Sequence, residues 1–191
     1  MRLPFFIALL IMSGLMACKE DETPDVYEPK QITRVQLIFS DKSGGAPITV
    51  SAEDPDGAGP LPVQASAFGL KSGTAYDLFI KLENELTDED VAELVEAAAT
   101  EHMLFYAFDD QLFASPEGTG NMDDRGAQVN YLDRDENGLP LGLITAWVTG
   151  EAGAIGSFRI KLQNQPNLKS ETSTSDEGFT DLDLTWQVTL Q

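Results

Sequence analysis

Apolar and polar residues alternate with a period of two along most of the chain from position 31 onward. The segment 181–190 is the clearest case, because leucine, tryptophan and valine at even positions alternate with aspartate, threonine and glutamine at odd ones. Such alternation is typical of a strand that buries one face and exposes the other. The same pattern predicts strands over 31–40, 47–52, 76–82 and 158–163.

Shorter apolar runs predict further strands near 62–69, 102–109, 127–132 and 142–149. Turn signals lie between the strands, at Ser43-Gly44-Gly45, Asp56-Gly57, Ser72-Gly73 and Asn137-Gly138. Alternation with one polar face belongs to antiparallel sheets. Many short strands separated by such turns predict a mainly β fold, an antiparallel β-sandwich of the immunoglobulin or fibronectin type with one inserted α-helix.

The segment from Leu70 to Tyr76 resembles the start of a late strand in immunoglobulin-like sandwiches. In those domains a tyrosine hydroxyl is hydrogen-bonded to the backbone a few residues upstream. Tyr76 begins a strongly alternating strand, as that motif requires. The alternative is a tyrosine that merely starts a strand.

The inserted helix is predicted over 88–101. Thr87 is a suitable N-cap, and the acidic residues that follow it complement the positive end of the helix dipole. The apolar residues repeat with helical spacing, at Val91, Leu94, Val95 and Ala98. The helix is therefore expected to cover one end or edge of the sandwich.

Residues 1–17 have the order of zones found in a secretory signal peptide. Arg2 supplies the positive start, and the run 3–12 that follows is apolar and uncharged. This run is too short to cross a bilayer, which requires about 20 residues, so the alternative of a membrane helix is disfavoured. The segment Leu15-Met16-Ala17-Cys18 resembles the bacterial lipobox. That resemblance implies cleavage before Cys18 and lipidation of its thiol.

Cys18 is the only cysteine, so an exported chain of this sequence cannot form an internal disulfide. Two or three acyl chains on it would hold the protein stably at a membrane. Residues 18–30 are acidic and contain two prolines, which predicts a disordered tether before a sandwich domain over 31–191. The residues Lys19-Glu20-Asp21-Glu22 resemble the surface-export tag of Bacteroidota lipoproteins; the alternative is an ordinary solvated tether.

The formal net charge of −20 argues against two kinds of partner. Nucleic acid is disfavoured because its phosphates require lysine and arginine. Electrostatic docking on anionic lipid is disfavoured for the same reason. Contact with the membrane is therefore expected through the lipid anchor alone.

One acidic segment has the spacing of half a calcium loop. Oxygen-bearing side chains stand at its first, third and fifth places, with Gly138 at the sixth: Asp133, Asp135 and Asn137. The twelfth place is Ile144 rather than glutamate, so this is not an EF-hand. Calcium would need further oxygens from other acidic loops, for example Asp54-Pro55-Asp56. The alternative is an Asn-Gly hairpin turn flanked by aspartates.

His102 is the only histidine and follows the predicted helix. Its imidazole has two chemical interpretations, as a metal ligand or as a general base. A single imidazole without a thiol makes a poor zinc or copper site, and the chain has no G-x-S-x-G turn for a nucleophile. His102 is therefore expected to be a junction residue between helix and strand, and no catalytic residue is predicted.

Taken together, the chain resembles a group of uncharacterised small outer-membrane lipoproteins of Bacteroidota. The matching features are the lipobox, Ile32-Thr33-x-Val35-x-Leu37, Asp54-Pro55-Asp56-Gly57, Glu101-His102-x-x-Phe105-Tyr106, Gly142-Leu143 before Trp147, and Thr180-Asp181-Leu182-Asp183. Some members are labelled as type 1 periplasmic-binding folds or GTP cyclohydrolases. This chain lacks the parallel α/β pattern of the first and the cysteine and histidine zinc ligands of the second.

The resemblance implies a lipid-anchored protein of the cell outer membrane, facing outward. The expected function is a non-enzymatic binding or accessory module of a larger outer-membrane protein complex. The alternatives are a calcium-dependent adhesin-like or carbohydrate-binding module and, third, a hydrolase that uses His102 with a carboxylate. No cofactor other than calcium is expected.

Overall fold

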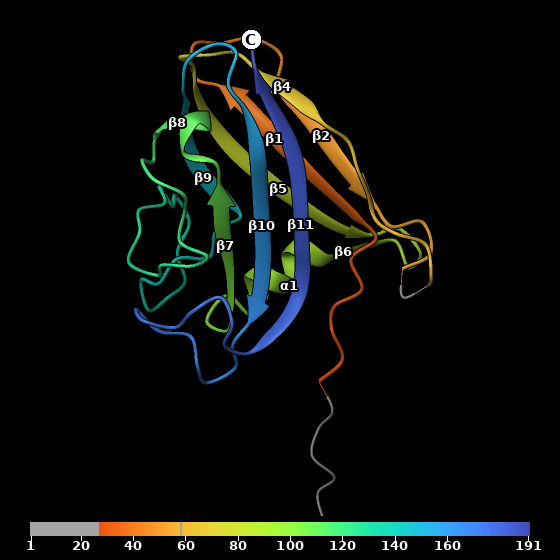
Figure 1. The fold of residues 1–191 in the computed structure, drawn as a ribbon. Helices are drawn as coiled ribbons and strands as arrows, with labels where there is room; N and C mark the ends of the chain where they lie inside the picture. Colours follow the sequence, from red (N-terminus) through yellow and green to blue (C-terminus); the bar gives the residue numbers. More distant parts are fainter. Residues whose placement is uncertain (1–26, 58) are drawn as a thin grey trace, which may run out of the picture.

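The computed structural model describes residues 27–57 and 59–191, so the predicted signal peptide and Cys18 lie outside the described residues. Two β-sheets pack face to face as a β-sandwich (Figure 1). The strands of the described part are β1 (Arg34–Asp41), β2 (Ile48–Glu53), β3 (Gln64–Ala65), β4 (Phe68–Leu70), β5 (Ala75–Asn84), β6 (Glu89–Asp90), β7 (His102–Phe108), β8 (Phe113–Ser115), β9 (Ile144–Thr149), β10 (Ile155–Asn164) and β11 (Phe179–Leu190). One α-helix, α1 (Val91–Ala97), and a 3-10 turn, η1 (Asp110–Leu112), complete the elements. No helix in this part of the chain is long and apolar enough to span a membrane.

The larger sheet has the strand order β3-β2-β1-β5-β9-β8, with β6 paired to the end of β5. The smaller sheet has the order β4-β11-β10-β7. All strand pairs are antiparallel except β4 and β11, which run parallel with Phe68 opposite Val188. The predicted β-sandwich is confirmed, and β4 with β11 is the one parallel pair among the named strands of the described part. The predicted strand 62–69 divides into β3 in one sheet and β4 in the other, and this change of sheet brings β4 to β11 in the parallel direction.

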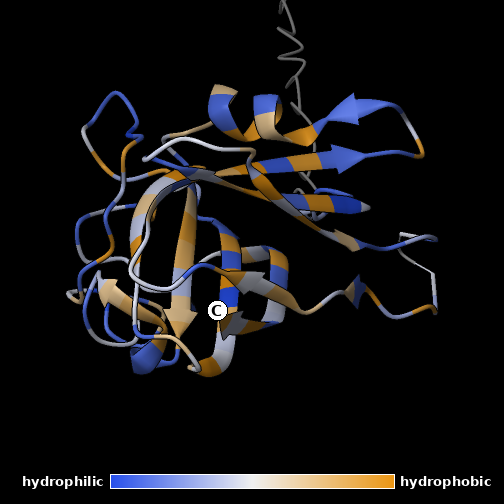
Figure 2. Ribbon diagram, turned by 90° about the horizontal axis from the view of Figure 1, so that it is seen from above, coloured by the Kyte–Doolittle hydropathy of each residue, from blue (hydrophilic) through white to orange (hydrophobic). Residues whose placement is uncertain are grey.

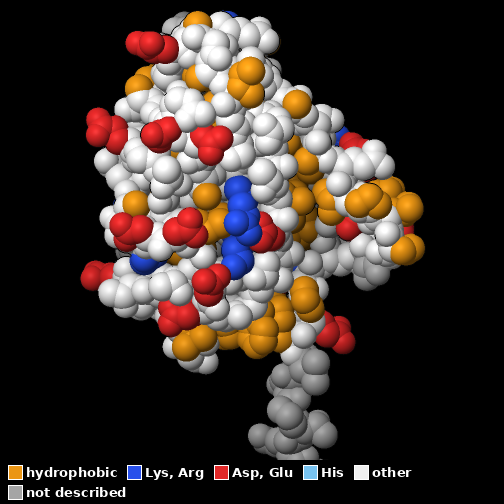
Figure 3. Space-filling model, in the orientation of Figure 1, with side chains coloured by type: hydrophobic (Ala, Val, Ile, Leu, Met, Phe, Trp, Pro, Cys, Tyr) orange, Lys and Arg blue, Asp and Glu red, His pale blue; other side chains and the backbone are white. Residues whose placement is uncertain are grey.

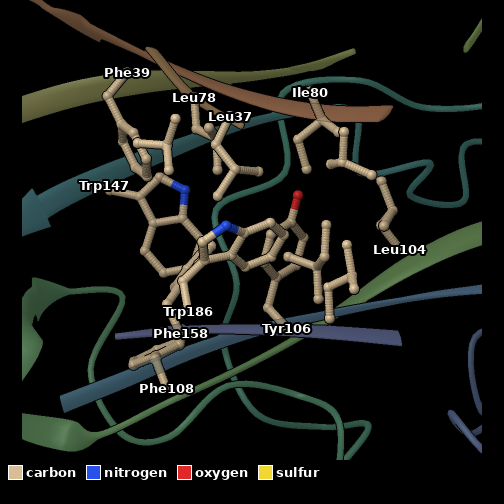
Figure 4. Packing of buried hydrophobic residues seen from close by; sticks show 14 of the residues in the cluster. Leu37, Phe39, Leu78, Ile80, Leu104, Tyr106, Phe108, Trp147, Phe158 and Trp186 are labelled. Carbon is tan, nitrogen blue, oxygen red and sulfur yellow. The ribbon is translucent and has the colours of Figure 1, made fainter. Parts of the chain in front are cut away.

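The core lies between the two sheets and follows the period-two pattern of the sequence. Hydrophobic and hydrophilic residues alternate along most strands (Figure 2). Trp147 and Trp186 are each 1% exposed and point into the core between the sheets (Figure 4), as expected from their strand positions. Phe79 faces outward and is 40% exposed, again as the alternation predicts.

Tyr76 makes the hydrogen bond that the sequence suggested. The backbone N–H of Lys71, five residues upstream, donates to the Tyr76 hydroxyl oxygen at 3.2 Å. The ring is buried and packs edge-on against Phe39 of β1, with the centroids 6.0 Å apart. The contact fixes the turn before β5 to the strand that follows it.

The helix is shorter than predicted and starts later. Asp90, rather than Thr87, caps it, because the Asp90 side chain accepts from the N–H groups of Ala92 and Glu93. Glu89 and Asp90 first pair with β5 as the short strand β6. The chain is therefore extended up to Asp90 and cannot be helical before it. Val91 and Val95 of α1 join the core.

The segment 116–142 is largely irregular, so the predicted strand 127–132 is wrong. Within it, Tyr131 makes one isolated bridge to Thr145 and donates its hydroxyl hydrogen to the Leu104 carbonyl oxygen at 2.7 Å. Met122 packs on Met103 and Phe105, which lie on the face of β7 turned away from the main core. The segment therefore covers β7, which is buried on both faces.

Candidate functional site

The N-terminal segment 27–30 lies across one end of the smaller sheet. The Tyr27 ring stacks on Phe179 at the start of β11, with the centroids 4.2 Å apart and the planes 17° apart. The Tyr27 hydroxyl donates to Asp181 Oδ1, and the Lys30 N–H donates to the same oxygen at 2.9 Å. The last residues of the expected tether are thus fixed to the sandwich. Figure 1 shows this segment ahead of β1, at the lower end of the domain.

Three strands bring polar side chains together beneath this segment. His102 opens β7, Asn164 ends β10 opposite it, and Asp181 lies near the start of β11. The alternation of β11 placed Asp181 on the polar, outward face. In the structure its side chain is 0% exposed, because the segment 27–30 covers it. No feature of the sequence near Asp181 indicates this partner.

His102 is the junction residue that the sequence predicts, and both of its ring nitrogens have neighbours. Nδ1 lies 2.9 Å from the Ala98 carbonyl oxygen at the end of α1. Nε2 lies 3.5 Å from Asp181 Oδ2. The ring is 1% exposed. In a nucleophilic triad, the nitrogen remote from the carboxylate activates a hydroxyl or thiol. Here that nitrogen faces a backbone carbonyl, so the geometry does not support the hydrolase hypothesis.

The charges at this end favour an ionised Asp181. Burial by itself would raise the pKa of Asp181, but His102, the Tyr27 hydroxyl and the Lys30 N–H outweigh it and hold the pKa below its usual value. Burial and the neighbouring Asp181 raise the pKa of Tyr27. A neutral phenol thus donates to a carboxylate, which is the stronger class of hydrogen bond.

The calcium candidates of the 133–138 loop have turn and ion-pair roles. The Asp133 carboxylate accepts from the backbone N–H groups of Gly142, Leu143 and Ile144 at 2.8–3.1 Å. Asp135 Oδ1 accepts from the N–H groups of Asn137 and Leu139, each at 2.9 Å. This is the hairpin alternative, in which the aspartates satisfy backbone donors rather than a cation.

Lys169 provides the positive charge opposite Asp135. Its Nζ lies 2.9 Å from Asp135 Oδ2 and donates to the Ala99 carbonyl oxygen at 2.7 Å. The side chains of both residues are almost fully buried. Burial lowers the pKa of Lys169, against the opposing effect of Asp135. Burial would raise the pKa of Asp135, but Lys169 and the backbone N–H groups lower it overall. The pair joins two loops, and no sequence pattern indicates that they meet.

Asp54 and Asp56 do not lie near Asp133 and Asp135. They belong to the loop after β2, on the opposite side of the sandwich from the segment 116–142 (Figure 1). Asp54 instead lines a cleft with Asp181 and the segment 28–32. In the described part of the chain, no three or more histidine, cysteine, aspartate or glutamate side chains are placed to hold a metal ion.

A second cleft, of about 400 Å³, lies beside β2. It opens where the chain leaves β3 and crosses to β4 in the other sheet. Its lining includes residues of β2 and Phe68 at the start of β4. No sequence pattern predicts this cleft, because the change of sheet within 62–69 does not alter the alternation of apolar and polar residues.

In comparisons with known proteins, the chain matches no protein-family model and no curated protein. The geometry of the docked segment 27–30 and of the β2 cleft is therefore the basis for a functional proposal.

Proposed function

We propose that the chain is a lipid-anchored binding module of the outer membrane that faces outward and serves as an accessory part of a larger envelope protein complex. The lipid is attached to Cys18, and the sandwich is the binding body. The observation that carries the proposal is the docking of Tyr27 and Lys30 on Asp181. This docking gives the membrane tether a fixed point of departure from the folded domain.

The spacing supports this arrangement. Nine residues, Cys18 to Val26, separate the proposed lipid from the docked segment. A fully extended chain of that length spans at most about 30 Å. The folded body is therefore held near the bilayer, while the net charge of −20 disfavours its direct adhesion to anionic lipid. A short tether and a folded domain that anionic lipid repels suit a module that acts beside a membrane-embedded partner.

The chemistry of the described residues also favours binding over catalysis. His102 is buried between a carbonyl and a carboxylate, and the acidic loop residues are engaged by backbone donors and Lys169. The clefts beside β2 and beside Asp181 offer surfaces on which a ligand can bind.

The test of the anchor uses Cys18→Ser in the native host. We expect the variant to lose incorporation of radiolabelled palmitate and to leave the outer-membrane fraction, while the wild type retains both. A matched variant tests whether the protein faces outward, and it replaces the four residues of the predicted export tag by alanine: Lys19→Ala/Glu20→Ala/Asp21→Ala/Glu22→Ala. It should remain lipidated but become inaccessible to proteinase K on intact cells. A Cys18→Ser protein that is still acylated and still sediments with outer membranes would contradict the proposal.

The accessory role needs its own measurement. Chemical cross-linking on intact cells, followed by purification of the wild-type lipoprotein, is expected to recover an integral outer-membrane protein in stable stoichiometry. Recovery of the lipoprotein alone, at every cross-linker length, would leave an anchored module without a complex and would count against this role.

A further inference from the structure

The outer edge of β2 is only partly paired. β1 pairs with β2 along Ile48–Glu53, whereas β3 on the other side pairs only with Ala52 and Glu53. After β3 the chain turns away, and Phe68 begins β4 against β11 of the other sheet. The residues 48–51 of β2 therefore have a strand partner on one side alone.

The hydrogen-bond register shows which backbone groups are free. The Asp54 N–H donates to the Thr33 carbonyl oxygen on the β1 side at 2.8 Å. Neighbouring residues in a strand direct their N–H and C=O groups to opposite edges. Ile48, Val50 and Ala52 therefore face β1, and Thr49, Ser51 and Glu53 face away from it. Glu53 meets Gln64 of β3. Thr49 has no backbone partner at this edge in the described part of the chain. Ser51 keeps a free N–H there, while the pairing of Ala52 with Ala65 directs the Ser51 carbonyl oxygen at the Ser66 N–H.

These free groups line the 400 Å³ cleft beside β2. Thr49 and Ser51 form one wall, while Ser66, Ala67 and Phe68 form the other. Phe68 is held in place by Phe39 of the core, with the ring centroids 5.5 Å apart. Figure 3 shows hydrophobic side chains along this side of the molecule, between the smaller sheet and the loop that follows β2. Leu61 and Val63 of that loop are 53% and 41% exposed.

The free groups specify the chemistry of an occupant. Outward N–H and C=O groups on alternate residues recur about every 7 Å along a strand. An extended polypeptide presents complementary groups at the same interval, which is the basis of recognition by strand addition. Apolar surface at Phe68 and polar surface at Ser66 suit a segment whose side chains alternate in the same way.

Charge decides between a partner protein and a second copy. The lining of the cleft contains Glu53 and no lysine or arginine. Two copies would each bring a net charge of −20 to the contact, and their mutual repulsion opposes edge-to-edge pairing. A basic segment is attracted instead. We infer that the β2 edge binds an extended, basic segment of a partner protein as an added strand. This inference rests on the proposed function and names the class of partner.

The first experiment uses the full lipidated chain in detergent micelles and a defined probe. The probe is the fluorescent peptide KTVTVTVTK with blocked ends, and its control is the same peptide N-methylated at alternate backbone amides. Fluorescence anisotropy is expected to show saturable binding of the unmethylated peptide. Methylation should weaken binding at least tenfold, because it removes backbone donors while keeping the charge. Absence of saturable binding, or equal binding of both peptides, would overturn the inference.

The second experiment changes the edge itself. Thr49→Pro removes an outward N–H that has no backbone partner, so proline is tolerated there as on other edge strands. Thr49→Ala keeps the N–H and is the matched control. Peptide binding should weaken at least tenfold in Thr49→Pro and stay within twofold of wild type in Thr49→Ala. Equal binding by both variants would place the peptide elsewhere and overturn the inference. The methylated peptide decides the matter on wild-type protein if Thr49→Pro does not fold.

Two further readouts separate the competing explanations. Analytical ultracentrifugation of the wild type should show one copy per micelle at neutral pH, and a dimer abolished by Thr49→Pro would make a second copy the occupant. Peptide binding in micelles does not depend on export or surface orientation. Its failure would therefore leave the anchoring experiments on Cys18 untouched, and failure of the anchoring experiments would leave the peptide result intact.

Discussion

The Tyr27 ring stacks on Phe179, 152 positions further along the sequence, and donates its hydroxyl hydrogen to Asp181 on the same strand. The first described residue of the chain is thus bound to the start of its last strand. Because the proposed lipid is attached at Cys18, this contact sets the point at which the anchor leaves the domain.

Tyr27→Ala is expected to release the segment 27–30 and to expose the Lys30–Gln31 bond to trypsin. Cleavage there should be at least tenfold faster than in the wild type, with the sandwich itself intact. Tyr27→Phe keeps the stacked ring and loses only the hydroxyl, so its rate of cleavage by trypsin should lie between those of the wild type and Tyr27→Ala. Equal cleavage rates in all three proteins, measured by mass spectrometry over time, would show that the docking does not persist in solution.

The two candidate helix caps can be compared directly. Asp90→Ala should lower the free energy of unfolding by about 1 kcal/mol, because two N–H groups of α1 lose their acceptor. Thr87→Ala should change it by less than about 0.5 kcal/mol, as for other exposed substitutions. Urea denaturation measures both values. A larger loss of unfolding free energy in Thr87→Ala than in Asp90→Ala would instead support the helix start at Thr87 that the sequence predicts.

Lys169→Met is expected to cost about 3 kcal/mol of folding free energy or more. The substitution keeps the length of the side chain but leaves the Asp135 charge buried without its partner. Lys42→Met is the matched control, since Lys42 pairs with Asp77 on the surface and such pairs contribute less than about 1 kcal/mol. Similar urea midpoints for the two variants would mean that the Lys169 pair is solvated in solution.

Asp181 should make the protein sensitive to acid. Its pKa is lowered in the folded state, so its stabilising contribution is present above its ordinary value of 3.8 and is lost as pH falls through the lower folded value. The stability gap between wild type and Asp181→Asn should therefore be widest near neutral pH and should narrow below pH ~4. Urea midpoints from pH 7 to pH 2 measure it, with the exposed Asp183→Asn as the control. A gap that stays constant with pH would contradict the ionised pairing.

Removal of divalent ions is expected to leave the melting temperature unchanged. The Asp133 and Asp135 carboxylates already accept backbone N–H groups, and Asp54 and Asp56 lie on another side of the sandwich. Differential scanning fluorimetry compares the melting temperature in EDTA with the melting temperature in excess calcium. The weakest calcium sites have a Kd of about 1 mM, so calcium is supplied at roughly 100 times that Kd. A rise of several degrees with calcium would support the adhesin-like alternative instead.

The sequence was sufficient to predict the β-sandwich, because a strand that is buried on one face alternates apolar and polar residues. The alternation in 181–190 gave the buried face of β11, and the same argument gave the faces of β1 and β5. It failed for 127–132, where apolar residues cover β7 without forming a strand. It also failed at Thr87, because pairing of Glu89 and Asp90 with β5 overrides a good local capping signal.

The sites were harder to predict than the strands, for a physical reason. The pattern identified His102 as a junction, and it offered a hairpin as the alternative to calcium at Asp133–Gly138, because both depend on neighbours in the sequence. It placed Asp181 outward, since nothing near Asp181 reveals that Tyr27 and Lys30 cover it. It likewise gave no sign that Lys169 reaches Asp135.

Local periodicity and turn chemistry, which act over a few residues, therefore determined the strand-rich class of this protein and its main buried faces, while the anchor at Cys18 is a prediction from the resemblance to the lipobox. Only the tertiary structure decided which distant groups meet. The docking of Tyr27 on β11, the buried pairs of Asp181 and Asp135, and the open edge at Thr49 and Ser51 all arise where the chain changes sheets or returns across them. Such contacts depend on the path of the chain in space, and period-two patterns carry no information about that path.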